Sequence, residues 1–354
     1  MLLALALCAG VLLGGCSRDI LDVNRRTLMF AIGVDYDEKA HEYAVTYVFS
    51  NLTGGQGGSS GGIGGASSPA QEPLTVRTET GTTAEDAISR LEDELPAQVF
   101  YGSARLLVMG EGLLQNGAQD AIYTVAALHE MPWRAYVAAT REDARAFLSA
   151  PEVLKQRPVY SIFQSRAIQD LALRPGYLFS TVSHASDARF AALLPLFTYA
   201  QQRVDFLGQV VLRGGREVSV VPTSDASLVV PLLTSGPEIY RVDLPGWSKN
   251  PVILGARSAK ASVRTAPDGS VLVRLHLLGF VYGRAQLVAA GFTDTALEQR
   301  IGSELAPRLT DRLLTLAKAG VDPRALADMP YVDTGSLVVR TDVYVTLDRN
   351  RQVS

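Results

Sequence analysis

The stretches TLMFAIGVD at residues 27–35 and EYAVTYVFS at residues 42–50 decide the fold. The second alternates apolar and polar residues, which is typical of a strand with one buried face. Asp37-Glu38-Lys39 between them suits a turn. We therefore predict two adjacent strands here, and the rest of the chain is interpreted outward from this pair.

Upstream of the pair, residues 2–13 (LLALALCAGVLL) are apolar and uncharged. Twelve residues rise only about 18 Å as a helix, which is too short to span a bilayer core and is typical of a signal peptide. The run ends in Leu13-Gly14-Gly15-Cys16, which resembles a bacterial lipobox. We predict a signal peptide at residues 1–15 and lipid attachment at Cys16. The alternatives are an ordinary secretory signal and a buried N-terminal helix.

Downstream, a Gly/Ser tract at residues 53–68 (TGGQGGSSGGIGGASS) offers too little apolar surface to order itself. PLTVRTET after it predicts a third strand, so we expect a flexible loop between two strands. Thr82-x-x-Glu85 is a capping box that predicts the start of a helix. The remaining elements predicted for an α/β domain at residues 16–155 are strands at 104–110 and 135–140 and helices at 112–128 and 142–150.

A middle domain is predicted at residues 156–250 and a C-terminal α/β domain at 251–354. The expected elements are a helix around 161–173, strands at 192–199, 205–212, 216–221 and 237–244, a hairpin of 252–265 with 270–283, a long helix at 297–318 and a last strand at 336–348. Pro307 is expected to kink or divide the long helix. The fold class is therefore α+β (mixed α/β), with three domains and mixed or antiparallel sheets flanked by helices.

The long helix carries a stripe of apolar residues at helical spacing, Leu297, Ile301, Leu305, Leu309, Leu313 and Leu316. We predict that the stripe packs in the core against the hairpin and the last strand. The alternative is that it forms a face for a partner protein.

Several function classes are excluded by the residues present. The net charge of −3 is too small to favour nucleic acid. After cleavage Cys16 is the one cysteine left, so the mature chain has no internal disulfide and no cysteine-based zinc site. None of the four histidines has the spacing of a zincin helix, and Gly57-x-Ser59-x-Gly61 lies in the Gly/Ser tract without the strand and helix of a nucleophile elbow. We expect no enzyme activity, no metal and no cofactor.

The order of several motifs resembles the Ger(x)C family, the lipoprotein C-subunits of spore germinant receptors. The residues that carry the resemblance are Gly33-Val34-Asp35, then Gly81, Thr83, Asp86 and Ala87, then Arg105, Gly110, Glu111 and Gly117, with looser matches at Gly208–Leu212, Gly214-Gly215 and Gly320-Val321-Asp322-Pro323.

The resemblance implies a three-domain mixed α/β protein without catalysis, anchored through Cys16 on the outer surface of the inner spore membrane. It implies a membrane A-subunit and a permease-like B-subunit as partners in a complex that responds to nutrients. Whether this subunit contacts the germinant stays open. The alternative function is a lipid-anchored solute-binding protein of a transporter, which would show two similar lobes. An exported hydrolase is a third, weakened by the lack of a nucleophile–base pair.

Overall fold

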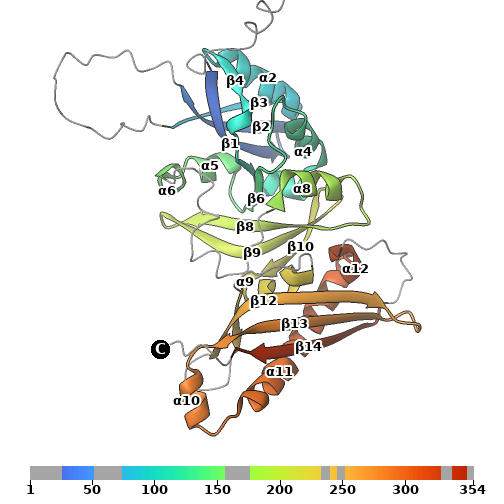
Figure 1. Ribbon diagram of the computed structural model, residues 1–354. Coiled ribbons are helices and arrows are strands. Elements are labelled where there is room, and N and C mark those ends of the chain that lie inside the picture. The colour runs from blue at the N-terminus through green and yellow to red at the C-terminus, as the bar shows by residue number, and fades with distance from the viewer. Residues whose placement is uncertain are drawn as a thin grey trace, which may run out of the picture.

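The structure is a computed structural model that describes residues 26–51, 74–155, 176–232, 240–244, 252–327 and 337–348. Cys16, the predicted signal peptide, the Gly/Ser tract and the helix predicted around residues 161–173 lie outside these ranges. The described chain forms two β-sheets flanked by helices (Figure 1). This arrangement confirms the predicted mixed α+β fold class.

In the described part of the chain, the larger sheet, sheet A, has ten strands. They are β1 (Arg26–Asp37), β2 (Glu42–Asn51), β3 (Thr75–Gly81), β4 (Gln98–Phe100), β5 (Leu106–Met109), β6 (Tyr136–Thr140), β7 (Gly176–Tyr177), β8 (Ala192–Ala200), β9 (Arg203–Arg213) and β10 (Arg216–Pro222). The order across the sheet is β10-β9-β8-β6-β5-β1-β2-β3, with β4 beside β1 and β7 beside β6. Parallel strands β8, β6, β5 and β1 form the centre, and antiparallel strands extend it on both sides.

The predicted strand pair is confirmed as β1 and β2, which run antiparallel with Val34 opposite Val45. Asp37 stabilises the turn between them, because its Oδ1 accepts hydrogen bonds from the backbone N–H groups of Lys39 and Ala40. The predicted third strand is confirmed as β3, which pairs with β2. The Gly/Ser tract therefore connects two strands that are neighbours in the sheet.

Helices cover both faces of sheet A. One face holds α2 (Ala84–Glu94), α3 (Glu111–Asn116), α4 (Gln119–Ala126) and α8 (Leu178–Ala185), and the other holds α5 (Ala144–Leu148) and α6 (Pro151–Lys155). Strand β5 shows why two cores form. Its residues Leu107 and Met109 belong to the first core, whereas Leu106 and Val108 belong to the second, because successive side chains of a strand point to opposite faces.

The single helix expected at residues 112–128 is wrong in one respect, because the structure divides it into α3 and α4. Gly117 lies between them with φ of +116°. A residue at such a positive φ ends the regular helix, and glycine adopts it without steric cost.

Sheet B has four strands in the order β11-β12-β13-β14. They are β11 (Tyr240–Leu244), β12 (Val252–Thr265), β13 (Val271–Val281) and β14 (Val339–Leu347). The predicted hairpin is confirmed as β12 and β13, with Gly269 in its turn at φ of +81°. The last strand is β14, which runs parallel to β13. The chain between them contains α10 (Arg284–Ala289), α11 (Asp294–Lys318) and α12 (Pro323–Leu326).

Helix α11 packs its predicted stripe in the core. All six apolar residues of the stripe are fully buried and belong to the same core as the inner face of sheet B. Gly302 allows a close approach, since a Cβ there would lie 2.5 Å from the carbonyl oxygen of Val343 on β14. Pro307 was expected to kink or divide the helix, and it does not divide it, because α11 continues through it. Leu305 and Leu309 are buried on both sides of the proline, and the free energy of their burial outweighs the backbone hydrogen bond that Pro307 cannot donate.

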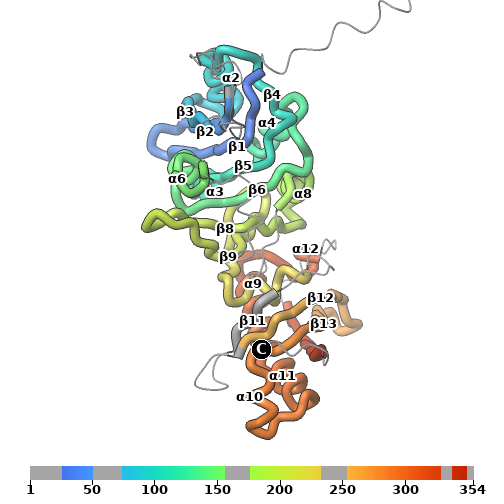
Figure 2. Tube along the Cα trace, turned by 60° about the vertical axis from the view of Figure 1, so that its left-hand side comes forward, coloured from blue at the N-terminus to red at the C-terminus, as the bar shows by residue number. Residues whose placement is uncertain are grey.

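A short helical segment joins the two sheets. Helix α9 (Thr223–Val229) and a 3₁₀ turn (Val230–Leu232) follow β10, and their buried residues share one core with Leu193 and Val211 of sheet A and with sheet B. Two views place α9 between the sheets (Figures 1 and 2). Asp225 of α9 pairs with Arg308 at 3.1 Å and Arg312 at 2.5 Å, both on α11.

Strands on both sides of residue 155 belong to sheet A, so the first two predicted domains share one sheet. The division into three domains stays a prediction. Among the described residues, no helix combines the length and the apolar character needed to cross a membrane.

Candidate functional site

The four central strands of sheet A, β1, β5, β6 and β8, are parallel and therefore end at one edge of the sheet. In open α/β sheets this carboxyl edge is where polar side chains gather and ligands bind. The residues placed here are Asp35 near the end of β1, Glu111 after β5, Arg141 and Glu142 after β6, and Thr198 near the end of β8.

Asp35 holds the start of helix α5. Its carboxylate accepts hydrogen bonds from the backbone N–H groups of Ala144 at 2.7 Å and Arg145 at 3.3 Å. Amides in the first turn of a helix have no partner within the helix, so the carboxylate satisfies them. The side chain is 8% exposed. Burial raises the pKa of Asp35 to about 6, and the two backbone donors act in the opposite direction.

Two glycines make this contact sterically possible. A Cβ on Gly110 would overlap Oδ1 of Asp35, and a Cβ on Gly33 would lie 2.8 Å from Cδ1 of Leu148 and 2.9 Å from Cβ of Ala144. The motif residues Gly33, Asp35 and Gly110 therefore meet at one point, where β1, β5 and α5 pack together.

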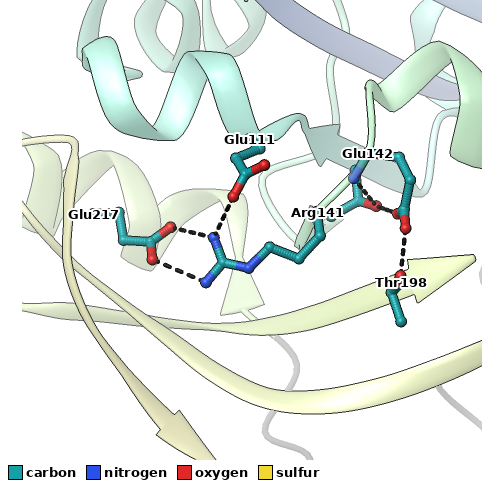
Figure 3. Close-up of polar contacts among 6 residues, drawn as sticks. Glu111, Arg141, Glu142, Thr198 and Glu217 are labelled. Atoms are coloured by element: carbon teal, nitrogen blue, oxygen red, sulfur yellow. Dashed lines mark hydrogen bonds and ion pairs between the residues drawn. The ribbon is translucent and has the colours of Figure 1, made fainter.

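Next to this point lies the Arg141 junction, which consists of Glu111, Arg141, Glu142, Thr198 and Glu217 (Figure 3). The guanidinium of Arg141 donates two hydrogen bonds to Glu217 at 2.9 and 3.0 Å and one to Glu111 at 3.1 Å. The paired Glu217 raises the pKa of Arg141. The fork geometry of arginine suits a bidentate carboxylate, so the junction links β6, α3 and β10.

Glu142 makes the second half of the Arg141 junction. Its carboxylate accepts hydrogen bonds from the hydroxyls of Thr140, at 2.6 Å, and Thr198. Figure 3 shows Glu142 and Arg141 pointing to different partners although they are neighbours in the chain. Every charged group of the junction thus has a polar partner, and the arrangement holds strands together instead of presenting an activated nucleophile.

A polar cleft of about 530 Å³ opens beside Asp35. It lies between the turn of β1 and β2, the edge strand β3, and helices α3 and α5. Five of its lining residues are acidic and two are basic, so its charge favours cationic groups. The acidic residues are Asp35, Asp37, Glu38, Glu42 and Asp143, and the basic residues are Lys39 and Arg145.

The histidines are spread over the structure. His41 lies 3.3 Å from the hydroxyl of Tyr36, and His276 stacks on Tyr344 with ring centroids 4.7 Å apart. His129 is exposed beside Glu130, and His184 lies in the last turn of α8. Within the described ranges, no three acidic, histidine or cysteine side chains are grouped as a metal site.

The motif around Gly81 begins helix α2. Thr83 is the N-cap, and its hydroxyl accepts a hydrogen bond from the N–H of Asp86 at 3.0 Å. The carboxylate of Asp86 accepts one from the N–H of Thr82 at 3.1 Å. The capping box predicted at Thr82 and Glu85 is therefore wrong by one residue, because the helix begins at Ala84 and its N-cap is Thr83. The buried stripe of the helix consists of Ala84, Ala87, Ile88 and Leu91.

The turn between β9 and β10 joins the same region. The carbonyl of Gly215 accepts a hydrogen bond from the N–H of Ala118 at 2.8 Å, and Arg216 donates to the carbonyl of Asn116 at 2.9 Å. The Gly214-Gly215 motif thus contacts the link between α3 and α4. The motif at Gly320 lies elsewhere, where Asp322 caps α12 and pairs with Arg324 at 2.6 Å.

Sequence reasoning singled out Gly33, Asp35, Gly110 and Glu111, and the structure brings these residues together. It did not identify Arg141, Glu142 or Glu217. A signal was present for the first two, because both directly follow the strand predicted at residues 135–140, and polar side chains gather at the ends of strands in parallel sheets. Glu217 is at the start of a strand far away in the chain, so only the tertiary structure pairs it with Arg141.

Known proteins resemble this chain in sequence and in fold. The model of a family described as the spore germination protein N-terminal domain matches residues 19–199, just over half of the chain. YfkR of Bacillus subtilis (strain 168), which is named as a spore germination protein, is 26% identical over 172 residues, which are 48% of this chain and 42% of that protein. The chain thus aligns with less than half of the length of this relative.

The crystal structure of the GerBC protein superimposes with a TM-score of 0.46 and 14% identity, covering 90% of this chain and 97% of that one. The family match contains Gly33, Asp35 and Gly110, which are the residues placed at close contacts above. On the family match over half of its length, this chain belongs to the Ger(x)C family of spore germination proteins, the C-subunits of germinant receptors.

Proposed function

We propose that the chain is a lipid-anchored, non-enzymatic subunit of a nutrient germinant receptor that acts by assembly with a membrane A-subunit and a permease-like B-subunit. The observation that carries the proposal is the family match, which begins at residue 19, three positions after Cys16. A lipid on Cys16 would therefore hold the matched region close to the membrane surface.

The site geometry supports a role without catalysis. Asp35 and the Arg141 junction occupy the edge of sheet A where an α/β enzyme would hold its reacting groups, and here they fasten α3, α5 and β10 to the central strands. A rigid body of this kind suits a subunit that holds or orders membrane partners.

Attachment through lipid on Cys16 is the second part of the proposal. The apolar run before the cysteine and the polar Ser17-Arg18-Asp19 after it support processing at this position. Two or more acyl chains anchor a protein stably, since each buried CH₂ contributes about 0.8 kcal/mol. We place the protein on the outer face of the inner spore membrane.

Radioactive palmitate labelling tests the anchor. Cys16→Ala should remain uncleaved by the lipoprotein peptidase and unlabelled. Cys8→Ala is the matched control, because it changes the other cysteine of the chain and leaves the lipobox intact, so it should label normally. Equal labelling of both variants would rule out Cys16 as the attachment site.

Spores test the function. Deletion should abolish the response to one nutrient set and leave the response to others intact, and the A- and B-subunits should no longer copurify. The solute-binding alternative requires two similar lobes, whereas sheets A and B differ in size and strand order. Turnover of ester, peptide, phosphate or glycoside substrates by the purified protein would contradict a role without catalysis.

A further inference from the structure

Two large aromatic side chains are exposed beside sheet A, Trp133 in the turn before β6 and Phe179 at the start of α8. Trp133 is 55% exposed and Phe179 is 51% exposed. The backbone N–H of Phe179 donates a hydrogen bond to the carbonyl of Trp133 at 3.0 Å. Exposed aromatic residues that are held together in this way, instead of being scattered singly, mark contact surfaces.

A stack of rings supports this pair. The ring of Tyr177 stacks on Phe179 with centroids 6.0 Å apart, and on its other side on Tyr136 with centroids 5.5 Å apart. Tyr136 begins β6, so the stack is fixed to the central sheet. We name Trp133, Tyr136, Tyr177 and Phe179 the aromatic edge. The aromatic edge is preformed in the free protein, and this preorganisation lowers the entropic cost of binding.

The aromatic edge lies at the amino ends of the parallel strands, where β6 begins. Arg26, the first residue of β1, lies 3.9 Å from Glu130. Glu130 precedes Trp133 by three residues in the loop before β6. Arg26 follows Cys16 by ten residues, and a chain of ten residues spans at most about 35 Å. A lipid on Cys16 would therefore keep this end of the domain within reach of the bilayer.

We propose that the aromatic edge docks onto the bilayer that holds the acyl chains of Cys16, with Trp133 and Phe179 in the interfacial layer. Tryptophan favours this layer, because its ring is apolar and its N–H remains hydrogen-bonded. Arg134, which is exposed beside Trp133, suits the same layer by extending its charge toward the headgroups. This inference rests on the proposed lipid anchor and adds a fixed orientation to it.

Sheet B provides a comparison surface outside the aromatic edge. Figure 1 shows β6 and α8, which carry Tyr136 and Phe179 of the aromatic edge, between β4 at one end of the molecule and sheet B at the other. The exposed Tyr344 on β14 provides a comparison position, since it is 48% exposed and stacks on His276.

Tryptophan fluorescence tests the docking. The chain has two tryptophans, so Trp247→Phe leaves Trp133 as the reporter. The full-length lipidated protein is reconstituted into vesicles of phosphatidylcholine and phosphatidylglycerol, with and without brominated acyl chains. We expect the emission of Trp133 to shift to shorter wavelength in vesicles and to lose intensity when the lipid is brominated.

The matched control is the variant Trp133→Phe, Trp247→Phe, Tyr344→Trp, whose reporter on sheet B should remain unquenched. Flotation of the vesicles measures separately whether the lipid on Cys16 attaches the protein to the membrane. If the protein floats but Trp133 stays unquenched, the docking is overturned and the anchor remains valid. The aromatic edge would then bind a protein partner instead of the bilayer. Equal quenching at positions 133 and 344 would also overturn the orientation. Protein that does not float would overturn the anchor and the docking together.

Discussion

The carboxylate of Asp35 accepts a hydrogen bond from the backbone N–H of Ala144 at 2.7 Å, although the two residues are 109 positions apart in the chain. This contact joins the end of β1 to the start of α5, and it requires glycine at positions 33 and 110. It therefore gives a structural reason for the Gly-Val-Asp motif, and the burial of this carboxyl group predicts that stability depends on pH.

Asp35→Asn should remove part of the pH dependence of stability. Burial raises the pKa of Asp35 from 3.8 to about 6, so between these values the folded protein binds a proton that the unfolded chain releases. The stability contributed by this group is present below pH 4 and is lost as the pH rises through 6, a change of about 3 kcal/mol. Urea unfolding from pH 4 to 7.5 measures it. The exposed Glu38→Gln should keep the wild-type slope, and identical slopes for Asp35→Asn and wild type would contradict the raised pKa.

Arg141→Ala should lower the free energy of unfolding by about 1–3 kcal/mol, because it leaves the half-buried carboxylates of Glu111 and Glu217 without their cation. Arg141→Lys should recover only part of the loss, since lysine cannot make two parallel hydrogen bonds. A double-mutant cycle with Glu217→Gln measures the coupling by denaturant unfolding. Additive effects of the two substitutions would show that the pair contributes nothing of its own.

Gln209→Met should stabilise the protein. Gln209 is fully buried on β9, and neither its side-chain nitrogen nor its oxygen has a hydrogen-bond partner. Replacing an unsatisfied buried amide by an apolar side chain of similar size should raise the free energy of unfolding by about 1–3 kcal/mol. Thermal unfolding measures the change, with the exposed Gln115→Met as the control that should have little effect. A destabilised Gln209→Met would indicate that the amide is satisfied in solution.

Leu309→Ala should cost about 2–5 kcal/mol, and Leu309→Asp should unfold the C-terminal part of the protein, because the side chain is fully buried against sheet B. Circular dichroism and denaturant unfolding measure both effects. Asp311→Ala, on the exposed face of α11, is the control. If Leu309→Asp is fully folded but inactive in spores, the stripe is an interface and the core assignment is wrong.

Replacing the Gly/Ser tract at residues 53–68 and its short flanks by an Asn-Gly turn should leave the melting temperature within a few degrees. Phe49 on β2 already lies opposite Thr75 on β3, so a tight turn can close the strand pair, and shortening a loop changes its closure entropy only slightly. Differential scanning calorimetry checks this. A cooperative loss of folding would show that the tract has a structural role.

The sequence by itself determined the elements whose pattern is local. The alternation in residues 42–50 and the turn at Asp37 were enough to predict β1 and β2, and a stripe at helical spacing was enough to predict α11 and its buried face. Such elements can be predicted because the period of apolar residues depends only on neighbours along the chain. The motif order likewise indicated the family that the match over residues 19–199 established.

Only the tertiary structure decided which elements meet. The pairing of β6 with β8 extends one sheet across residue 155, and the parallel pairing of β13 with β14 completes sheet B. Arg141 pairs with Glu217, which lies 76 positions later in the chain. The contact between Trp133, before β6, and Phe179, in α8, is of the same kind. These contacts leave no periodic signal, because a single side chain or strand edge has many chemically equivalent partners, and packing of the whole core selects among them.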